Sequence, residues 1–155
     1  MVLGIILSAR RIGGPSFRHN GADALSQLRK YTRKADTPVT AVQLDLDTDG
    51  FTYRKWGGVQ KASAGDWLVN NGGDVYTVER GVFERTYRML GPGVYAKDQP
   101  VWARVAAADG NIHTREGITN YLAGDMIVFN DENERDGYAM SAKTFDRLYQ
   151  PADET

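Results

Sequence analysis

Basic residues lie beside aromatic residues in two short segments of the chain, a combination suited to binding a flat, negatively charged ligand. Residues 53–56 read Tyr-Arg-Lys-Trp, and Trp102 stands two residues before Arg104. Alternate residues of a strand share a face, so Arg54 would lie beside Trp56, and Trp102 beside Arg104. A cation next to an indole can hold a nucleobase and its phosphate. The alternative is that both indoles are partly buried between two halves of the molecule.

Two asparagines complete the predicted site. Asn71 and Asn130 end equivalent strands of a repeat, where their amides would form polar walls of two equivalent grooves together with Asp66, Asp125 and tyrosine hydroxyls. The structural alternative is that both aspartates bind backbone amides at a strand entrance. The ligand-binding residues predicted from the sequence are Arg54, Lys55, Trp56, Asn71, Trp102, Arg104, Arg115 and Asn130.

The pattern of acidic residues and histidines gives less support to other chemistry. Residues 45–50 match the start of a calcium loop, but the position of its bidentate glutamate is Trp56, so a polar hairpin turn is favoured. The acidic loop 131–136 is favoured as a solvated hairpin tip over a loose cation site. His19 and His113 lack catalytic or metal-binding spacing, and the chain has no cysteine. We therefore predict no catalytic residue, no metal and no cofactor, with a carboxylate- or metal-dependent hydrolase as an alternative.

The elements that must position these residues come in two copies. Residues 64–69, Ala-Gly-Asp-Trp-Leu-Val, return as Ala-Gly-Asp-Met-Ile-Val at 123–128. Phe-Glu-Arg-Thr-Tyr at 83–87 returns as Phe-Asp-Arg-Leu-Tyr at 145–149. A duplicated pattern predicts a fold with pseudo-twofold symmetry.

Each copy reads as a series of short strands separated by turns. The turn Asn-Asn-Gly-Gly at 70–73 predicts a hairpin, and Val42, Leu44 and Leu46 alternate with polar residues as in a half-buried strand. The fold class predicted is mainly β (α+β), with two pseudo-symmetric SH3-like small barrels or rolls, short helical turns, and an N-terminal arm and helix. The predicted division is 1–30 for a basic arm with a strand near 3–9 and a helix at 22–31, 31–90 for the first β-repeat, and 91–155 for the second, in one compact unit.

Charge is distributed unevenly along the chain. Residues 1–35 carry seven basic residues and one acidic residue, whereas the other residues carry 12 basic and 19 acidic residues. The basic arm would dock on the body or on another subunit, contact a phosphate-bearing ligand, or be solvated. The acidic body makes a large nucleic-acid footprint unlikely, since phosphate neutralisation dominates such binding.

The repeated motifs resemble a known family. Tyr-x-Lys-x-x-Pro-Val-x-Ala, Gly-Asp-Trp-Leu-Val and Phe-x-x-Thr-Tyr are similar to the small phage and bacterial proteins named for a Pro-Gly-Asp-Tyr-Gly (PGDYG) motif. The likeness covers about residues 31–150, with Ala64 and Ala123 in place of the motif's proline and Trp67 and Met126 in place of its tyrosine. The resemblance transfers no catalytic residue and implies an accessory protein of phage or bacterial origin.

Together these features favour a non-enzymatic binding protein that sequesters a small anionic, nucleotide-like ligand as a homo-oligomer. A protein–protein adaptor or inhibitor of a host or virion protein is the main alternative. No apolar run of 18 residues is present, so no membrane segment is expected. The absence of cysteine fits a cytoplasmic location.

Overall fold

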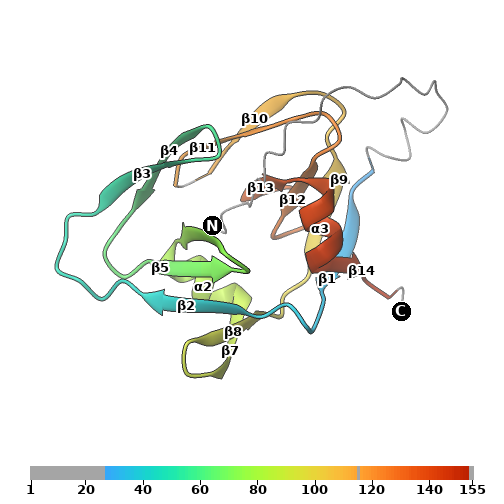
Figure 1. Ribbon diagram of the computed structural model, residues 1–155. Coiled ribbons are helices and arrows are strands. Elements are labelled where there is room, and N and C mark those ends of the chain that lie inside the picture. The colour runs from blue at the N-terminus through green and yellow to red at the C-terminus, as the bar shows by residue number, and fades with distance from the viewer. Residues whose placement is uncertain (1–26, 115, 154–155) are drawn as a thin grey trace.

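The computed structural model describes residues 27–114 and 116–153, and about half of these residues lie in strands (Figure 1). The mainly β prediction is therefore confirmed. One antiparallel sheet, the β2 sheet, has the strand order β6-β5-β2-β8-β7. Its strands are β2 (Val39–Gln43), β5 (Trp67–Asn71), β6 (Asp74–Val78), β7 (Tyr87–Gly91) and β8 (Val94–Lys97).

A second antiparallel sheet, the β9 sheet, has the order β13-β12-β9-β1-β14. Its strands are β1 (Arg29–Arg33), β9 (Val101–Val105), β12 (Met126–Phe129), β13 (Gly137–Met140) and β14 (Tyr149–Pro151). The two orders match strand for strand, with β2 equivalent to β9, β5 to β12, β6 to β13 and β7 to β14. Both sheets end in edge strands and remain open.

The match requires one exchange between the halves of the chain. β1 precedes β2 in sequence, yet it lies in the β9 sheet, where Tyr31 is opposite Val101 and Pro151. β8 precedes β9 in sequence, yet it lies in the β2 sheet, where Tyr95 is opposite Val39. Each sheet thus takes one strand from the other half, and the predicted boundary between residues 90 and 91 does not separate the sheets.

A short helix follows each outer hairpin. α2 (Arg80–Thr86) starts at Glu79, whose carboxylate accepts a hydrogen bond from the Val82 backbone N–H. α3 (Ala142–Leu148) starts at Ser141, whose hydroxyl accepts one from the Thr144 N–H. Such capping stabilises helices of this length, and the tertiary contacts of Phe83 and Phe145 add to it. Within the described residues, neither seven-residue helix is long enough to cross a membrane.

Two further hairpins extend from the sheets and meet each other (Figure 1). They are β3 (Phe51–Lys55) with β4 (Gly58–Ala62), and β10 (Gly110–His113) with β11 (Ile118–Tyr121). Gln60 forms a bridge with Gly117, where a Cβ atom would approach the Val59 carbonyl oxygen to 2.0 Å. Glycine is therefore required for this close contact between the hairpins.

One apolar core is shared by both sheets. Val69 and Val78 from the β2 sheet and Val101 and Val128 from the β9 sheet have no exposed surface and belong to the same buried cluster. Around them, aromatic rings pack on Phe83 of α2 and on Phe145 of α3. A unit of about 57 residues could bury little apolar surface alone, so the shared core stabilises both units.

Two sequence predictions about elements are wrong. The predicted strand at 3–9 lies outside the described residues, and the predicted helix at 22–31 lies partly outside them, but its residues Arg29–Tyr31 belong to strand β1. The Tyr31 ring packs edge-on against Phe145 with centroids 4.8 Å apart, and the pairing of β1 with both β9 and β14 outweighs a weak helical propensity.

The second error concerns which residues of β2 face the core. Val42 and Leu46 are 58% and 60% exposed, whereas Val39 is buried. The strand begins at Val39, so its odd-numbered residues face the core.

Strand β4 was not predicted from the sequence. Trp56 and Gly57 form a two-residue turn with φ of 54° and 77°, after which the chain pairs back along β3 as β4.

Candidate functional site

The exchanged strands carry two cations into the interior between the sheets. Arg33 lies at the end of β1 and Lys97 at the end of β8, at equivalent positions of the two halves. Each donates to an equivalent asparagine, Asn71 or Asn130, and Arg33 also lies 5.6 Å from the ring centroid of Tyr149. We call Arg33, Thr37, Asn71 and Tyr76 the Arg33 corner, and Lys97, Asn130, Tyr138 and Tyr149 the Lys97 corner.

The Arg33 corner is closed by its own hydrogen bonds. The guanidinium donates to the Thr37 hydroxyl (2.9 Å) and carbonyl (3.0 Å) and to Asn71 Oδ1 (3.1 Å). Asn71 Nδ2 then lies 3.5 Å from the Tyr76 hydroxyl. Both ends of the Asn71 amide are therefore occupied by protein groups.

The Lys97 corner leaves one donor unused. Lys97 Nζ donates to the Tyr138 hydroxyl (2.9 Å) and to Asn130 Oδ1 (3.3 Å), and the hydroxyls of Tyr138 and Tyr149 are 3.2 Å apart. Because Asn130 Oδ1 accepts from the ammonium, Nδ2 is the other end of that amide, and it is buried with no partner among the described residues. A buried donor of this kind is costly unless a further acceptor reaches it.

Burial and charge shift the pKa values of the buried tyrosines near these corners in different directions. Burial raises the pKa of Tyr87 to about 12 and holds that of Tyr138 well above its usual value. Burial alone would also raise the pKa of Tyr149, but the charges of Lys97 and Arg33 lower it. Burial lowers the pKa of Lys97. Among the described residues, no carboxylate forms an ion pair with Arg33 or Lys97, so tyrosine oxygens are their nearest acidic groups.

A pocket of about 290 Å³ opens next to the Lys97 corner. We call it the α2 pocket, because α2 forms one wall while β9 and the β12–β13 loop form the others. Its lining residues come from both halves of the chain and are Val82, Arg85, Thr86, Gln99, Pro100, Trp102, Asn130, Asp131 and Asp136.

Three polar groups of the residues that line the α2 pocket have no partner among the described residues. The Arg85 guanidinium and the Asp136 carboxylate have no ion-pair or hydrogen-bond partner in the part of the chain that the structure describes. The third group is Asn130 Nδ2. Trp102 adds a half-buried indole, over which Lys30 lies at 5.5 Å from the ring centroid. A pocket with a free cation, a free amide donor and an aromatic wall can hold an anionic group attached to a flat ring.

The loop that carries Asp136 is held in place by its own bonds. Arg104 Nε pairs with Glu134 Oε1 at 2.9 Å, and Asp131 Oδ1 accepts hydrogen bonds from the N–H groups of Asn133 (2.8 Å) and Arg135 (3.3 Å). Asp136 has a φ of 53°, in the left-handed region that aspartate and asparagine tolerate better than most residues. The pocket wall is therefore preorganised.

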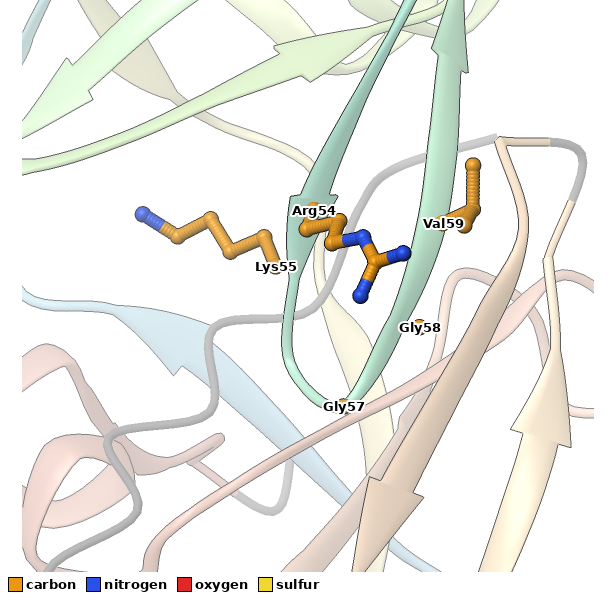
Figure 2. A pocket seen from close by; sticks show the side chains of 5 residues that line it. All are labelled: Arg54, Lys55, Gly57, Gly58 and Val59. Carbon is orange, nitrogen blue, oxygen red and sulfur yellow. The ribbon is translucent and has the colours of Figure 1, made fainter.

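The first predicted segment does not form one groove. Arg54 and Lys55 point to opposite sides of the β3–β4 hairpin, where a shallow pocket of about 460 Å³ is lined by both residues together with Gly57, Gly58 and Val59 (Figure 2). Lys55 Nζ is bound by Asp74 Oδ1 at 2.5 Å and the Val75 carbonyl oxygen at 2.6 Å. Trp56 is 8% exposed and packs on Tyr76, so its ring offers no open face.

The second predicted segment lies closer to a site. Trp102 and Asn130 both line the α2 pocket, whereas Arg104 lies behind the loop and anchors it through Glu134. Asn71 belongs to the closed Arg33 corner, and Arg115 lies outside the described residues. Asp66 and Asp125 accept backbone hydrogen bonds from Ser63 and Leu122, as the structural alternative expected.

Sequence reasoning missed Arg33, Lys97, Arg85 and Asp136. A signal for the first two was present, because a basic residue stands two positions after the first tyrosine in both copies. Arg85 and Asp136 also recur, as Arg147 and Asp74, but their proximity to each other depends on packing α2 against the other half of the chain.

Comparison of the chain with models of known protein families, with curated proteins and with solved structures gives no match.

Proposed function

We propose that the protein is a non-enzymatic binding protein that sequesters a small anionic, nucleotide-like ligand, and that the α2 pocket is its binding site. The observation that carries the proposal is the unused Asn130 Nδ2 beside a free Arg85 guanidinium and the Trp102 indole. Donors left without partners in a preformed pocket are satisfied when a ligand supplies oxygen acceptors.

Each group has a distinct role in this proposal. Arg85 and Asn130 bind the oxygens of a phosphate or carboxylate group, and the nearby Lys97 adds positive potential. Trp102 packs on the flat ring of the ligand. Asp136 accepts hydrogen bonds from ligand hydroxyl or amino groups.

The wider setting of the proposal comes from the sequence. We propose that the two halves are tandem copies of one SH3-like unit, and the matching strand orders support this. The resemblance to the PGDYG family supports a phage or bacterial accessory protein that acts in the cytoplasm.

The test is calorimetric titration with the four common nucleoside monophosphates, together with thermal unfolding. At a ligand concentration of 100 Kd, binding stabilises the folded state by about 2.7 kcal/mol. Arg85→Gln and Trp102→Ala should each weaken binding at least tenfold. Arg147→Gln and Thr40→Ala change the equivalent positions of the other half and should leave binding unchanged.

The proposal fails if none of the monophosphates gives heat or a thermal shift at millimolar concentration. It also fails if the matched controls weaken binding as much as Arg85→Gln and Trp102→Ala do. Circular dichroism of each variant shows whether the fold is intact.

A further inference from the structure

We infer that the α2 pocket selects a ligand with a single phosphate group, a nucleoside monophosphate in preference to a di- or triphosphate, and that one ligand binds per chain. This inference rests on the proposed function and names the ligand class and stoichiometry of the same site. It follows from the charges of the pocket, its size, and the state of the equivalent place in the other half.

The charges of the pocket limit how many phosphates it accepts. Arg85 is accompanied by two carboxylates, Asp131 and Asp136, on the opposite wall. Asp131 uses one oxygen to bind backbone amides of its loop, while Asp136 has no partner among the described residues. One phosphate can pair with the Arg85 guanidinium and accept a hydrogen bond from Asn130 Nδ2, but each additional phosphate would meet carboxylates without a cation of its own.

The same carboxylates favour a sugar. An ionised carboxylate has acceptors only, so Asp136 can be satisfied by hydroxyl or amino groups of the ligand. A pocket of about 290 Å³ lies at the lower end of the range for small-molecule sites. Size and charge together fit a nucleoside that carries one phosphate.

The equivalent place in the other half is closed. Thr40 stands where Trp102 stands, Asp74 is paired with Lys55, and both ends of the Asn71 amide are bonded. A side chain added at Gly72 would come within 3.5 Å of the Arg147 guanidinium, which covers the short turn there. The described residues therefore offer one such pocket in spite of the duplicated fold.

The experiment compares one nucleoside with its mono-, di- and triphosphate by calorimetric titration of the full chain. We expect a stoichiometry of one per chain, with the monophosphate binding at least tenfold more tightly than both the nucleoside and the triphosphate. Asp136→Asn should reduce the ratio of monophosphate affinity to triphosphate affinity at least threefold, because it removes one negative charge from the pocket. Asparagine also tolerates the left-handed backbone at this position. Glu132→Gln removes a charge from the same loop outside the pocket and should not change the preference.

The outcomes separate the inference from the proposed function. If no nucleotide binds, the proposed function fails. If nucleotides bind but the triphosphate binds as tightly as the monophosphate, or two ligands bind per chain, the inference is overturned and the proposed function stands. If Glu132→Gln changes the preference as much as Asp136→Asn, the carboxylate of the pocket is not the cause and the charge argument is wrong.

Discussion

The Arg33 corner and the Lys97 corner occupy equivalent places, yet one is closed and the other borders a pocket. In the first, Asn71 joins Arg33 to Tyr76, and Asp74 is held by Lys55. In the second, the amide nitrogen of Asn130 has no partner among the described residues. The duplicated frame is the same in both, so the difference arises from side chains and one loop.

The loop accounts for much of this difference. In the β2 sheet a tight turn through Gly72 and Gly73, with φ of 62° and 97°, joins β5 to β6. In the β9 sheet the longer loop 130–136 joins β12 to β13 and places Asp131 and Asp136 beside Trp102. A longer loop in one copy thus accompanies a pocket beside that corner, while the corner of the other copy is closed.

The largest predicted effect concerns the aromatic stacks of the two halves. Phe83 lies between Trp67 and Tyr87, with ring centroids 4.1 and 4.5 Å away, and also contacts Tyr95. Phe83→Ala should lower the free energy of unfolding by about 3–5 kcal/mol, measured in urea.

Phe145→Ala tests whether the halves contribute equally to stability. Phe145 contacts two rings, those of Tyr31 and Tyr149, rather than three. Its loss should therefore cost about 0.5–1.5 kcal/mol less than the loss of Phe83, the value of one aromatic pair. Equal or greater destabilisation by Phe145→Ala would contradict this ranking, and the exposed Leu90→Ala serves as a control with little effect.

The next effect concerns the equivalent tyrosines that follow the helices. The pKa of Tyr87 is raised to about 12, so between pH 10 and 12 the unfolded chain loses a proton that the folded chain keeps. Stability should then fall with rising pH by about 1.4 kcal/mol per pH unit from this group. Tyr87→Phe should remove this part of the loss of stability at alkaline pH. The measurement is urea unfolding at several pH values between 10 and 12.

Tyr149 should behave in the opposite way. Its pKa is lowered in the folded state, because the charges of Lys97 and Arg33 outweigh its burial. Its ionisation therefore contributes stability above pH 10 that is lost as the pH falls through its folded pKa. Tyr149→Phe should remove a rise in stability between that lowered pKa and pH 10, and a smaller alkaline loss of stability like that of Tyr87→Phe would show that the two tyrosines do not differ electrostatically.

The smallest effect concerns the aspartates at the start of β6 and before β13. Asp74→Asn breaks a largely buried pair with Lys55, in which the side chains are 12% and 24% exposed, and should lower the free energy of unfolding by about 1–3 kcal/mol. Asp136→Asn removes no pair among the described residues and should change it by less than about 0.5 kcal/mol. A substantial loss of stability from Asp136→Asn would mean that Asp136 is structural and would remove it from the proposed site.

Local patterns predicted the elements that depend on neighbouring residues. The hairpin turn at 70–73 and the short helical turn of each copy were predicted, because turn residues and spacing determine them. Strand β1 was read as a helix, since its form depends on pairing with β9 and β14 far along the chain.

The candidate site was predicted less well. Trp102 and Asn130 were named from the sequence, and both line the α2 pocket. Arg85 was not named, because α2 of one half reaches β9 of the other half through the tertiary fold. Trp56 was expected to face a ligand with Arg54, but the turn at Trp56 rotates its indole into the core.

The exchange of β1 and β8 has a consequence for the integrity of the chain. A protease that cut the exposed turn between Pro92 and Gly93 would leave two fragments, each contributing an internal strand to the sheet of the other. Neither fragment could dissociate without breaking the hydrogen bonds on both sides of its internal strand. The two halves are therefore interlocked by the exchanged strands, and we expect the two fragments to stay associated after the chain is cut.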